Sequence, residues 1–114
     1  MSTSEQLQKH HFMVYAPDST EPGTLQRRLA LRPEHLERIN TLRTSGVLKV
    51  IGPTLTPESV LPGAEQKLNG SLLIAEASSI EEVKKIVEGD VFYTENVWDK
   101  EKMIITPMIL AHPK

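Results

Sequence analysis

The sequence contains no cysteine, which excludes disulfides, zinc–thiolate sites and thiol nucleophiles. Basic residues do not gather in one block and the formal net charge is −2, so the composition indicates no nucleic-acid surface. No apolar run approaches the roughly 20 residues that a membrane-spanning helix needs. The first residues are polar and contain no apolar signal core. We therefore expect a cytoplasmic protein that has neither nucleic acid nor a membrane as partner.

The 114 residues are enough for one domain with one modest core. We expect this domain to cover residues 10–114 and residues 1–9 to form a disordered tail. No metal-ligand spacing and no glycine-rich phosphate loop occurs, so the sequence indicates neither a metal nor another cofactor. His10 and His11 are neighbours, and on a strand they would face opposite sides.

Six secondary-structure elements are expected from apolar spacing and turn signals. Strand-like runs cover residues 11–16, 47–51, 71–76 and 103–106. Helical spacing covers residues 25–45 and the segment from Ser78 or Ser79 to Gly89, and Asn69-Gly70 is typical of a turn. The order strand, helix, strand, strand, helix, strand predicts the ferredoxin-like α+β fold. In that fold, two helices cover one face of an antiparallel sheet.

The expected strands are apolar on both faces. In the first strand, Phe12 and Val14 point one way while Met13 and Tyr15 point the other. Two helices can cover only one of these faces. A second copy of the chain would cover the other, so the pattern predicts a homodimer packed sheet to sheet. The alternative is a monomer whose loop over residues 53–69 and C-terminal tail fold over the second face.

The first helix contains an unusual segment, Arg32-Pro33-Glu34-His35. A row of apolar residues at helical spacing predicts the core-facing side of this helix: Leu25, Leu29, Leu36, Ile39 and Leu42. Arg32 and His35 interrupt this row, and buried charge needs a partner. Pro33 either starts the main helix after a short turn over residues 24–31 or kinks one longer helix. Both alternatives place His35 in the first turn of the main helix.

His35 and Asp90 are expected at the same end of the domain. In the ferredoxin-like order, the first helix starts at the end of the sheet where the second helix finishes, and Asp90 follows that helix. A carboxylate beside imidazole orients the ring, selects its tautomer and favours its charged form, which suits a general acid or base. Arg32 offers a positive fork for a carboxylate, phenolate or phosphate, and Ser71 offers a hydroxyl. Each residue also has a structural alternative, such as a surface ion pair or a turn.

Two further segments complete the expected pocket. Phe92, Tyr93 and Trp98 follow Asp90 closely and are candidates for an apolar wall, although aromatic residues also build cores. The loop over residues 53–69 carries Lys67 and is a candidate for closing over the site.

Several short segments occur together in one order: Arg28-Leu29-Ala30-Leu31-Arg32-Pro33-Glu34-His35-Leu36, Gly46, Gly52-Pro53, Gly70-Ser71, Ile74-Ala75-Glu76, and Asp90 before an aromatic. In this order they resemble the YciI-like (YCII-related) domain family, from about His11 to Pro107. The Arg-Pro-x-His-Leu segment is the most specific part of the resemblance. The family usually has a proline after the aspartate, where this sequence has Val91, so a rigid turn is missing.

The resemblance implies a dimeric α+β barrel of ferredoxin-like subunits. It also implies a His–Asp pair as the active site, which corresponds here to His35 and Asp90, with Gly70 and Ser71 beside the pocket. A few members resemble lyases or dehydrochlorinases of substituted hydroquinones. The wider superfamily includes isomerases and cofactor-free monooxygenases.

Two functions are consistent with these residues. The first is an enzyme for a small anionic or phenolic molecule, in which His35 moves a proton and Asp90 orients His35, so that elimination or isomerisation follows. This enzyme needs no cofactor, and its substrate-binding residues would be Arg32, Ser71, Gly70 and Phe92. The second is a non-catalytic dimeric module that binds a metabolite or a partner protein. In a third interpretation, the His35–Asp90 pair only stabilises the fold.

Overall fold

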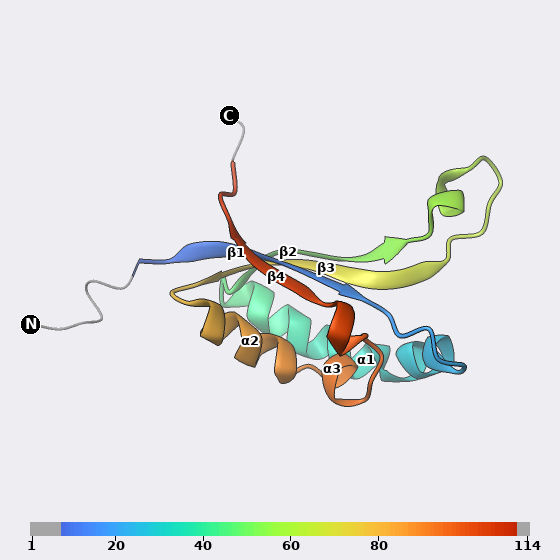
Figure 1. Cartoon of the computed structure of the whole chain (residues 1–114), viewed down its shortest axis with the longest axis horizontal. Coiled ribbons are helices and arrows are strands. Elements are labelled where there is room, and N and C mark those ends of the chain that lie inside the picture. Colours follow the sequence, from blue (N-terminus) through green and yellow to red (C-terminus); the bar gives the residue numbers. More distant parts are fainter. Residues whose placement is uncertain (1–7, 112–114) are drawn as a thin grey trace, which may run out of the picture.

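Four antiparallel strands and two long helices make up the fold (Figure 1). The computed structural model describes residues 8–111, so most of the expected tail over residues 1–9 lies outside the described residues. The strands are β1 (His10–Pro17), β2 (Leu48–Leu55), β3 (Leu68–Ala77) and β4 (Ile104–Met108), in the spatial order β2-β3-β1-β4. The helices α1 (Thr24–Thr44) and α2 (Ile80–Glu88) lie on the same face of this sheet. The expected ferredoxin-like α+β fold is therefore confirmed.

The start of α2 follows from its serines and acids. Ser79 Oγ accepts a hydrogen bond from the backbone N–H of Glu82, and the Glu82 carboxylate accepts one from the backbone N–H of Ser78. These bonds satisfy amides that a helix start leaves without partners. Val83 and Val87 then point into the core. Within residues 8–111, no helix is both long enough and apolar enough to cross a bilayer.

The helix α1 passes through Pro33 without interruption. The alternative of a separate helix starting at Pro33 is therefore wrong, and His35 lies in the middle of α1 rather than in a first turn. Proline at this position removes the hydrogen bond to the carbonyl of Leu29, four residues earlier. Leu29 is 54% exposed, so water can satisfy that carbonyl and the helix continues.

The side of α1 that faces inward differs from the expected leucine row. Three leucines are 40–54% exposed: Leu25, Leu29 and Leu36. The buried side consists of Thr24, Arg28, His35 and Ile39. At about 100° per residue, the three leucines lie roughly a quarter turn from His35, and Arg32 lies between them and is exposed. The expectation failed because Arg28 and His35 both have acidic partners, the partly buried Asp18 and the buried Asp90, which offset the cost of burying them.

The strand β3 begins earlier than the sequence predicted and includes Asn69-Gly70, which is not a turn. A Cβ atom on Gly70 would lie 2.8 Å from Thr54 Oγ1 and 2.9 Å from the carbonyl oxygen of Ala16. Glycine at this position therefore permits close strand packing. The strand β2 also continues past Gly52 and Pro53, because an edge strand tolerates proline.

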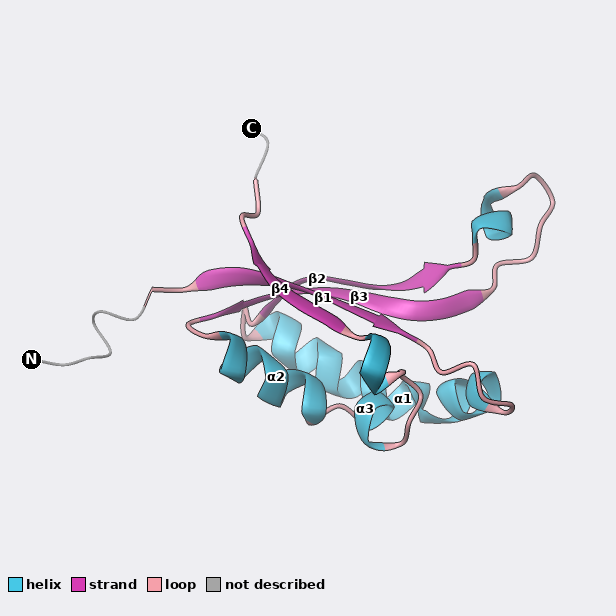
Figure 2. Cartoon of the chain, viewed as in Figure 1, coloured by secondary structure: helices cyan, strands magenta, loops and turns pink. Residues whose placement is uncertain are grey.

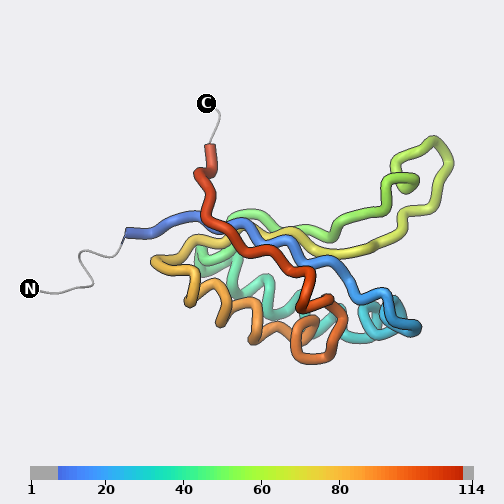
Figure 3. Tube along the Cα trace, in the orientation of Figure 1, coloured from blue at the N-terminus to red at the C-terminus, as the bar shows by residue number. Residues whose placement is uncertain are grey.

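The expected loop over residues 53–69 is shorter than predicted and covers residues 56–67, with a 3₁₀ turn at Pro57–Val60. This loop projects beyond the end of the sheet (Figure 3). It does not fold back over the face opposite the helices, as the monomeric alternative required.

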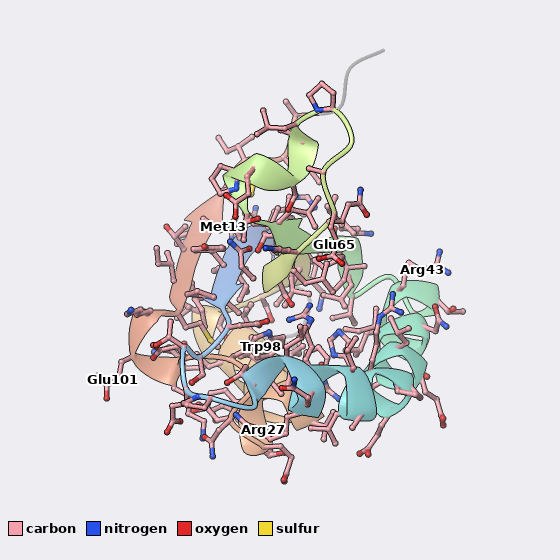
Figure 4. All side chains as sticks on the ribbon, turned by 90° about the vertical axis from the view of Figure 1, so that its right-hand side faces the viewer. Met13, Arg27, Arg43, Glu65, Trp98 and Glu101 are labelled. Carbon is pink, nitrogen blue, oxygen red and sulfur yellow. The ribbon has the colours of Figure 1, made fainter. Side chains whose placement is uncertain are left out.

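The two faces of the sheet have different surroundings. The core lies between the sheet and the helices and includes Phe12, Val14 and Trp98. The opposite face, here called the open face, carries Met13, Tyr15, Leu72 and Ile74, with Met13 paired to Ile74 and Tyr15 paired to Leu72. Figure 4 shows Met13 and Trp98 on opposite sides of the sheet. No helix of the described chain covers the open face (Figure 1).

Candidate functional site

His35 and Asp90 form a buried pair at the centre of the candidate site. His35 Nδ1 lies 2.8 Å from Oδ1 and 2.9 Å from Oδ2 of Asp90, and the two residues are 6% and 1% exposed. An ionised carboxylate can only accept hydrogen bonds, so Nδ1 carries the hydrogen and donates it. In the neutral ring, Nε2 therefore bears the lone pair. Nε2 makes no hydrogen bond to any residue from 8 to 111, so it is the nitrogen left for a ligand.

The helix α3 (Val91–Thr94), a short element that the sequence did not predict, fixes the position of Asp90. Asp90 is its N-cap, and Oδ1 accepts a hydrogen bond of 2.9 Å from the Phe92 N–H. Arg38 Nη1 lies 3.6 Å from Oδ2. The helix α3 contacts both α1 and α2 (Figure 2). The cap bond thus orients the carboxylate although Val91, and not the rigid proline of the resemblance, follows Asp90.

Aromatic rings hold the His35 imidazole on two sides. Phe92 stacks on it with 3.9 Å between centroids and 8° between planes. Trp98 meets its edge at 6.1 Å and lies between the sheet and α1 (Figure 4). Tyr93 is not part of this group, because its ring packs under Lys100 Nζ at 4.5 Å. Phe92 and Trp98 thus both contact His35, but of the aromatic residues expected to form an apolar wall only Phe92 borders the cavity beside His35.

A cavity of about 200 Å³ lies between one flank of α1 and the strands β2 and β3. Three arginines and His35 border it, and no carboxylate does. Its lining residues are Arg28, Arg32, His35, Leu36, Ile39, Asn40, Arg43, Ile51, Gly52, Pro53, Ser71 and Phe92. Larger hollows of about 240 to 480 Å³ occur elsewhere, but His35 does not border them. Chemistry rather than size therefore identifies the site, and an apolar wall with several cations suits a small organic anion.

Arg28 is a site residue that the sequence interpretation missed. It is 3% exposed, and its Nη1 donates to Asp18 Oδ1 at 2.7 Å. Its Nη2 donates to the Gly70 carbonyl at 3.2 Å and to Ser71 Oγ at 3.3 Å. Its Nε has no acceptor in the described part of the chain. Burial raises the pKa of Asp18, and the neighbouring Arg28 guanidinium acts in the opposite direction.

Most of the other residues expected at the site border the cavity. Arg32 lies there as an exposed residue, and Ser71 and Phe92 lie there as buried ones. Gly70 does not border the cavity. It acts on the site indirectly, since its backbone carbonyl accepts a hydrogen bond from Arg28. Lys67 does not line the cavity either. Of the expected closing loop over residues 53–69, only Pro53 borders the cavity, and it lies in β2.

The sequence contains a pattern that predicts an inward-facing Arg28, but the more regular spacing of the leucines was followed instead. Arg28 precedes His35 by seven residues and Ile39 follows it by four, so all three share one face of a helix. Helical spacing counted from His35, rather than from Leu25, would have identified Arg28 as an inward-facing cation. No signal in the sequence pointed to Asp18 as its partner, because Asp18 lies in a loop between two elements.

Known proteins match nearly the whole chain. A family model described as the YCII-related domain matches residues 11–109. "Fusaric acid biosynthesis protein 2" from Gibberella fujikuroi is 34% identical over 96 residues, which cover 84% of this chain and 89% of that protein. "Protein YciI" from Escherichia coli is 33% identical over 88 residues, which cover 77% of this chain and 87% of that protein.

A solved structure also resembles the chain. It is the 5-chloro-2-hydroxyhydroquinone dehydrochlorinase from Burkholderia phenoliruptrix in complex with 2,5-dihydroxybenzoquinone. Its TM-score is 0.69 at 31% sequence identity, and the alignment covers 90% of this chain and 95% of that chain. The fold, the family model and these relatives agree, and the chain belongs to the YCII-related domain family.

Proposed function

We propose that the protein is an enzyme that moves a proton on a small anionic or phenolic organic molecule bound in the cavity of about 200 Å³. One observation carries this proposal. His35 is held at Nδ1 by both oxygens of Asp90, and it borders a cavity that has three arginines and no carboxylate. The related dehydrochlorinase, whose name specifies a hydroquinone substrate, supports the substrate class.

In the proposed step, His35 Nε2 removes a proton from a carbon or hydroxyl of the bound molecule. The electron pair of the broken bond either moves onto a neighbouring oxygen or expels a leaving group from the adjacent carbon. The cavity arginines stabilise the negative charge that develops, and Asp90 stabilises the imidazolium. His35 then returns the proton to a different atom in an isomerisation, or releases it to solvent after an elimination.

The test uses 5-chloro-2-hydroxyhydroquinone and close analogues, with chloride release and mass-spectrometric product detection as readouts. We expect His35→Gln to lower kcat/KM about 100-fold or more, because general acid–base catalysis contributes at least that much. His10→Gln is the matched control, since His10 is an exposed histidine at the start of β1, and it should leave the rate unchanged. Turnover that survives His35→Gln would refute the proposed role.

Binding of the same compounds without any product would favour the non-catalytic module. Isothermal titration calorimetry on the wild-type protein detects that outcome directly. Asp90→Asn tests the third interpretation, in which the His35–Asp90 pair only stabilises the fold. In that case the variant should have a lower free energy of unfolding, and ligand binding should be absent from wild type and variant alike.

We also propose that the protein is a homodimer through the open face. Its apolar side chains lie in register across β1 and β3, and Val50 and Ile104 beside them are 42% and 49% exposed. A continuous apolar face of this kind is typical of an interface. A two-fold dimer would bury it against its own copy.

A further inference from the structure

Ser71 lies in a network that determines which kind of hydrogen bond it can make. Its Oγ accepts one bond from Arg28 Nη2 at 3.3 Å and another from Trp98 Nε1 at 3.1 Å. Guanidinium and indole N–H groups only donate, so Ser71 must be the acceptor in both bonds. A serine oxygen has two acceptor positions, and both are occupied.

The Ser71 hydroxyl hydrogen is therefore the part of this group that remains available. Ser71 donates no hydrogen bond to any residue of the described chain, although it is only 2% exposed. It borders the same cavity as His35. Arg28 is also a cavity residue, and its buried Nε–H lacks an acceptor too. Two buried groups of the cavity thus have hydrogens to donate and no protein atom to receive them.

We infer that Ser71 determines substrate specificity by acting only as a donor, so that the ligand atom beside it must accept a hydrogen bond. A carbonyl oxygen or an oxyanion satisfies this requirement in every orientation. A neutral hydroxyl binds less well, because its oxygen can accept from Ser71 only while its own hydrogen points away from the donors around Ser71. The inference rests on the proposed use of this cavity. It narrows the substrate class from phenols in general to molecules that present a ketone, quinone, enolate or phenolate oxygen to Ser71.

The inference also fits the proposed chemistry. When His35 removes a proton next to a carbonyl carbon, negative charge moves onto the carbonyl oxygen. A group that can only donate stabilises that charge and would not need to rotate first. His35 Nε2 and Ser71 Oγ thus have opposite roles in one cavity, the first accepting a hydrogen and the second donating one.

The test compares two probes with the same carbon and oxygen skeleton. The first is 2,5-dihydroxybenzoquinone, and the second is 1,2,4,5-tetrahydroxybenzene, in which both carbonyl oxygens are hydroxyls. Affinities are measured anaerobically by calorimetry, and the readout is the ratio of the two dissociation constants. The absolute ratio includes the different charges of the probes, so the change of this ratio between variants is decisive.

Trp98→Phe removes one of the two donors to Ser71 and leaves the hydroxyl in place. The variant frees one acceptor position on Oγ, so Ser71 could then receive a hydrogen from the tetrahydroxy probe. We expect the preference for the quinone to fall about fivefold, which is the effect of one hydrogen bond.

Val97→Ala is the matched control, because Val97 is fully buried beside Trp98 and donates nothing to Ser71 from its side chain. It should lower stability and leave the ratio unchanged. A wild-type ratio in folded Trp98→Phe would overturn the inference, and so would a wild-type protein that does not bind the quinone. These outcomes are independent of the His35→Gln turnover assay, so the specificity inference and the proposed function can fail separately.

Discussion

At the residue scale, the site depends on hydrogen-bond directions that specific partners impose. Asp90 can only accept, so His35 Nδ1 must donate, and Ser71 receives two donors, so its own hydrogen stays available. The side chains that impose these directions are themselves buried and held by the backbone. A carboxylate capped by the Phe92 N–H cannot rotate without losing that bond.

The tautomer of His35 can be tested directly. In the wild-type protein, ¹⁵N chemical shifts at alkaline pH should show hydrogen on Nδ1 and a lone pair on Nε2. An asparagine side chain both donates and accepts, so Asp90→Asn should give a mixture of the two tautomers. His10, which is exposed and distant from Asp90, provides the control and should give the same shifts in both proteins. Identical His35 shifts in both proteins would show that Asp90 does not determine the tautomer.

Gly70 offers a test of close packing between strands. Gly70→Ala places a Cβ 2.9 Å from a backbone oxygen that cannot move away easily, so we expect a loss of about 1–3 kcal/mol in the free energy of unfolding. Gly52→Ala is the matched control, because no atom lies within 4 Å of the added carbon. Urea unfolding measures both variants. Equal stability of the two alanine variants would contradict the packing argument.

At the element scale, local sequence decides where each helix begins, and partners distant in the chain decide which side of it is buried. The helix α2 begins directly after its N-cap, Ser79. The side chains of Ser79 and Glu82 accept hydrogen bonds from backbone N–H groups that have no partner within the helix. The side of α1 with Arg28 and His35 faces inward because these residues pair with Asp18 and Asp90, respectively. Helical spacing alone could not choose between this side and the leucine side, since both recur at the same period.

The cap of α2 should make stability depend on pH. Hydrogen bonds from the Ser78 hydroxyl and backbone N–H lower the pKa of Glu82 in the folded chain. The unfolded chain therefore binds more protons between the folded and unfolded values, so the contribution of Glu82 is present above the usual glutamate pKa and is lost below it. Unfolding free energies of wild type and Glu82→Gln should differ at pH 7 and converge as pH falls toward 3. Glu81→Gln, at the neighbouring exposed position, controls for the loss of one charge, and convergence there as well would contradict the assignment to the cap.

At the scale of the whole molecule, the sheet has one face packed against helices and one apolar open face. Alternation along β1 puts Phe12 and Val14 in the core and leaves Met13 and Tyr15 half-buried on the other side. The loop over residues 56–67 extends beyond the sheet rather than over it (Figure 3). These features support the proposed dimer and leave the cavity on the helix side of the sheet.

Assembly can be tested by placing a charge on the open face. Leu72→Glu should give a monomer, because the carboxylate would be buried without a partner in a sheet-to-sheet interface. Leu29→Glu is the control, since Leu29 is an exposed leucine on α1 and does not border the cavity. Analytical ultracentrifugation measures the mass of each variant. A dimer that survives Leu72→Glu but dissociates with Leu29→Glu would locate the interface on the leucine flank of α1 instead.

Residue patterns along the chain were enough to predict the order of the main elements and the ferredoxin-like class. They also led to the expectation that His35 lies near Asp90, although that argument placed His35 in the first turn of a helix and the structure places it in the middle of α1. Apolar spacing, glycines and capping residues act over a few positions, so they can be recognised along the chain. The early start of β3 was not predicted, because Asn69-Gly70 was interpreted as a turn. In the structure, Gly70 lies in the strand and allows it to approach the backbone of Ala16 closely.

Contacts between distant parts of the chain are needed to tell which side of α1 is buried, that Arg28 belongs to the site, and that Arg32 is exposed. The partners of Arg28 and His35 come from a loop and from the cap of α3, and His35 and Asp90 are 55 positions apart in the chain. The free energy of burying a charge depends on such a partner, and no local pattern records it. For the same reason, the direction of the Ser71 hydroxyl follows from two donors on other elements and not from the residues next to it.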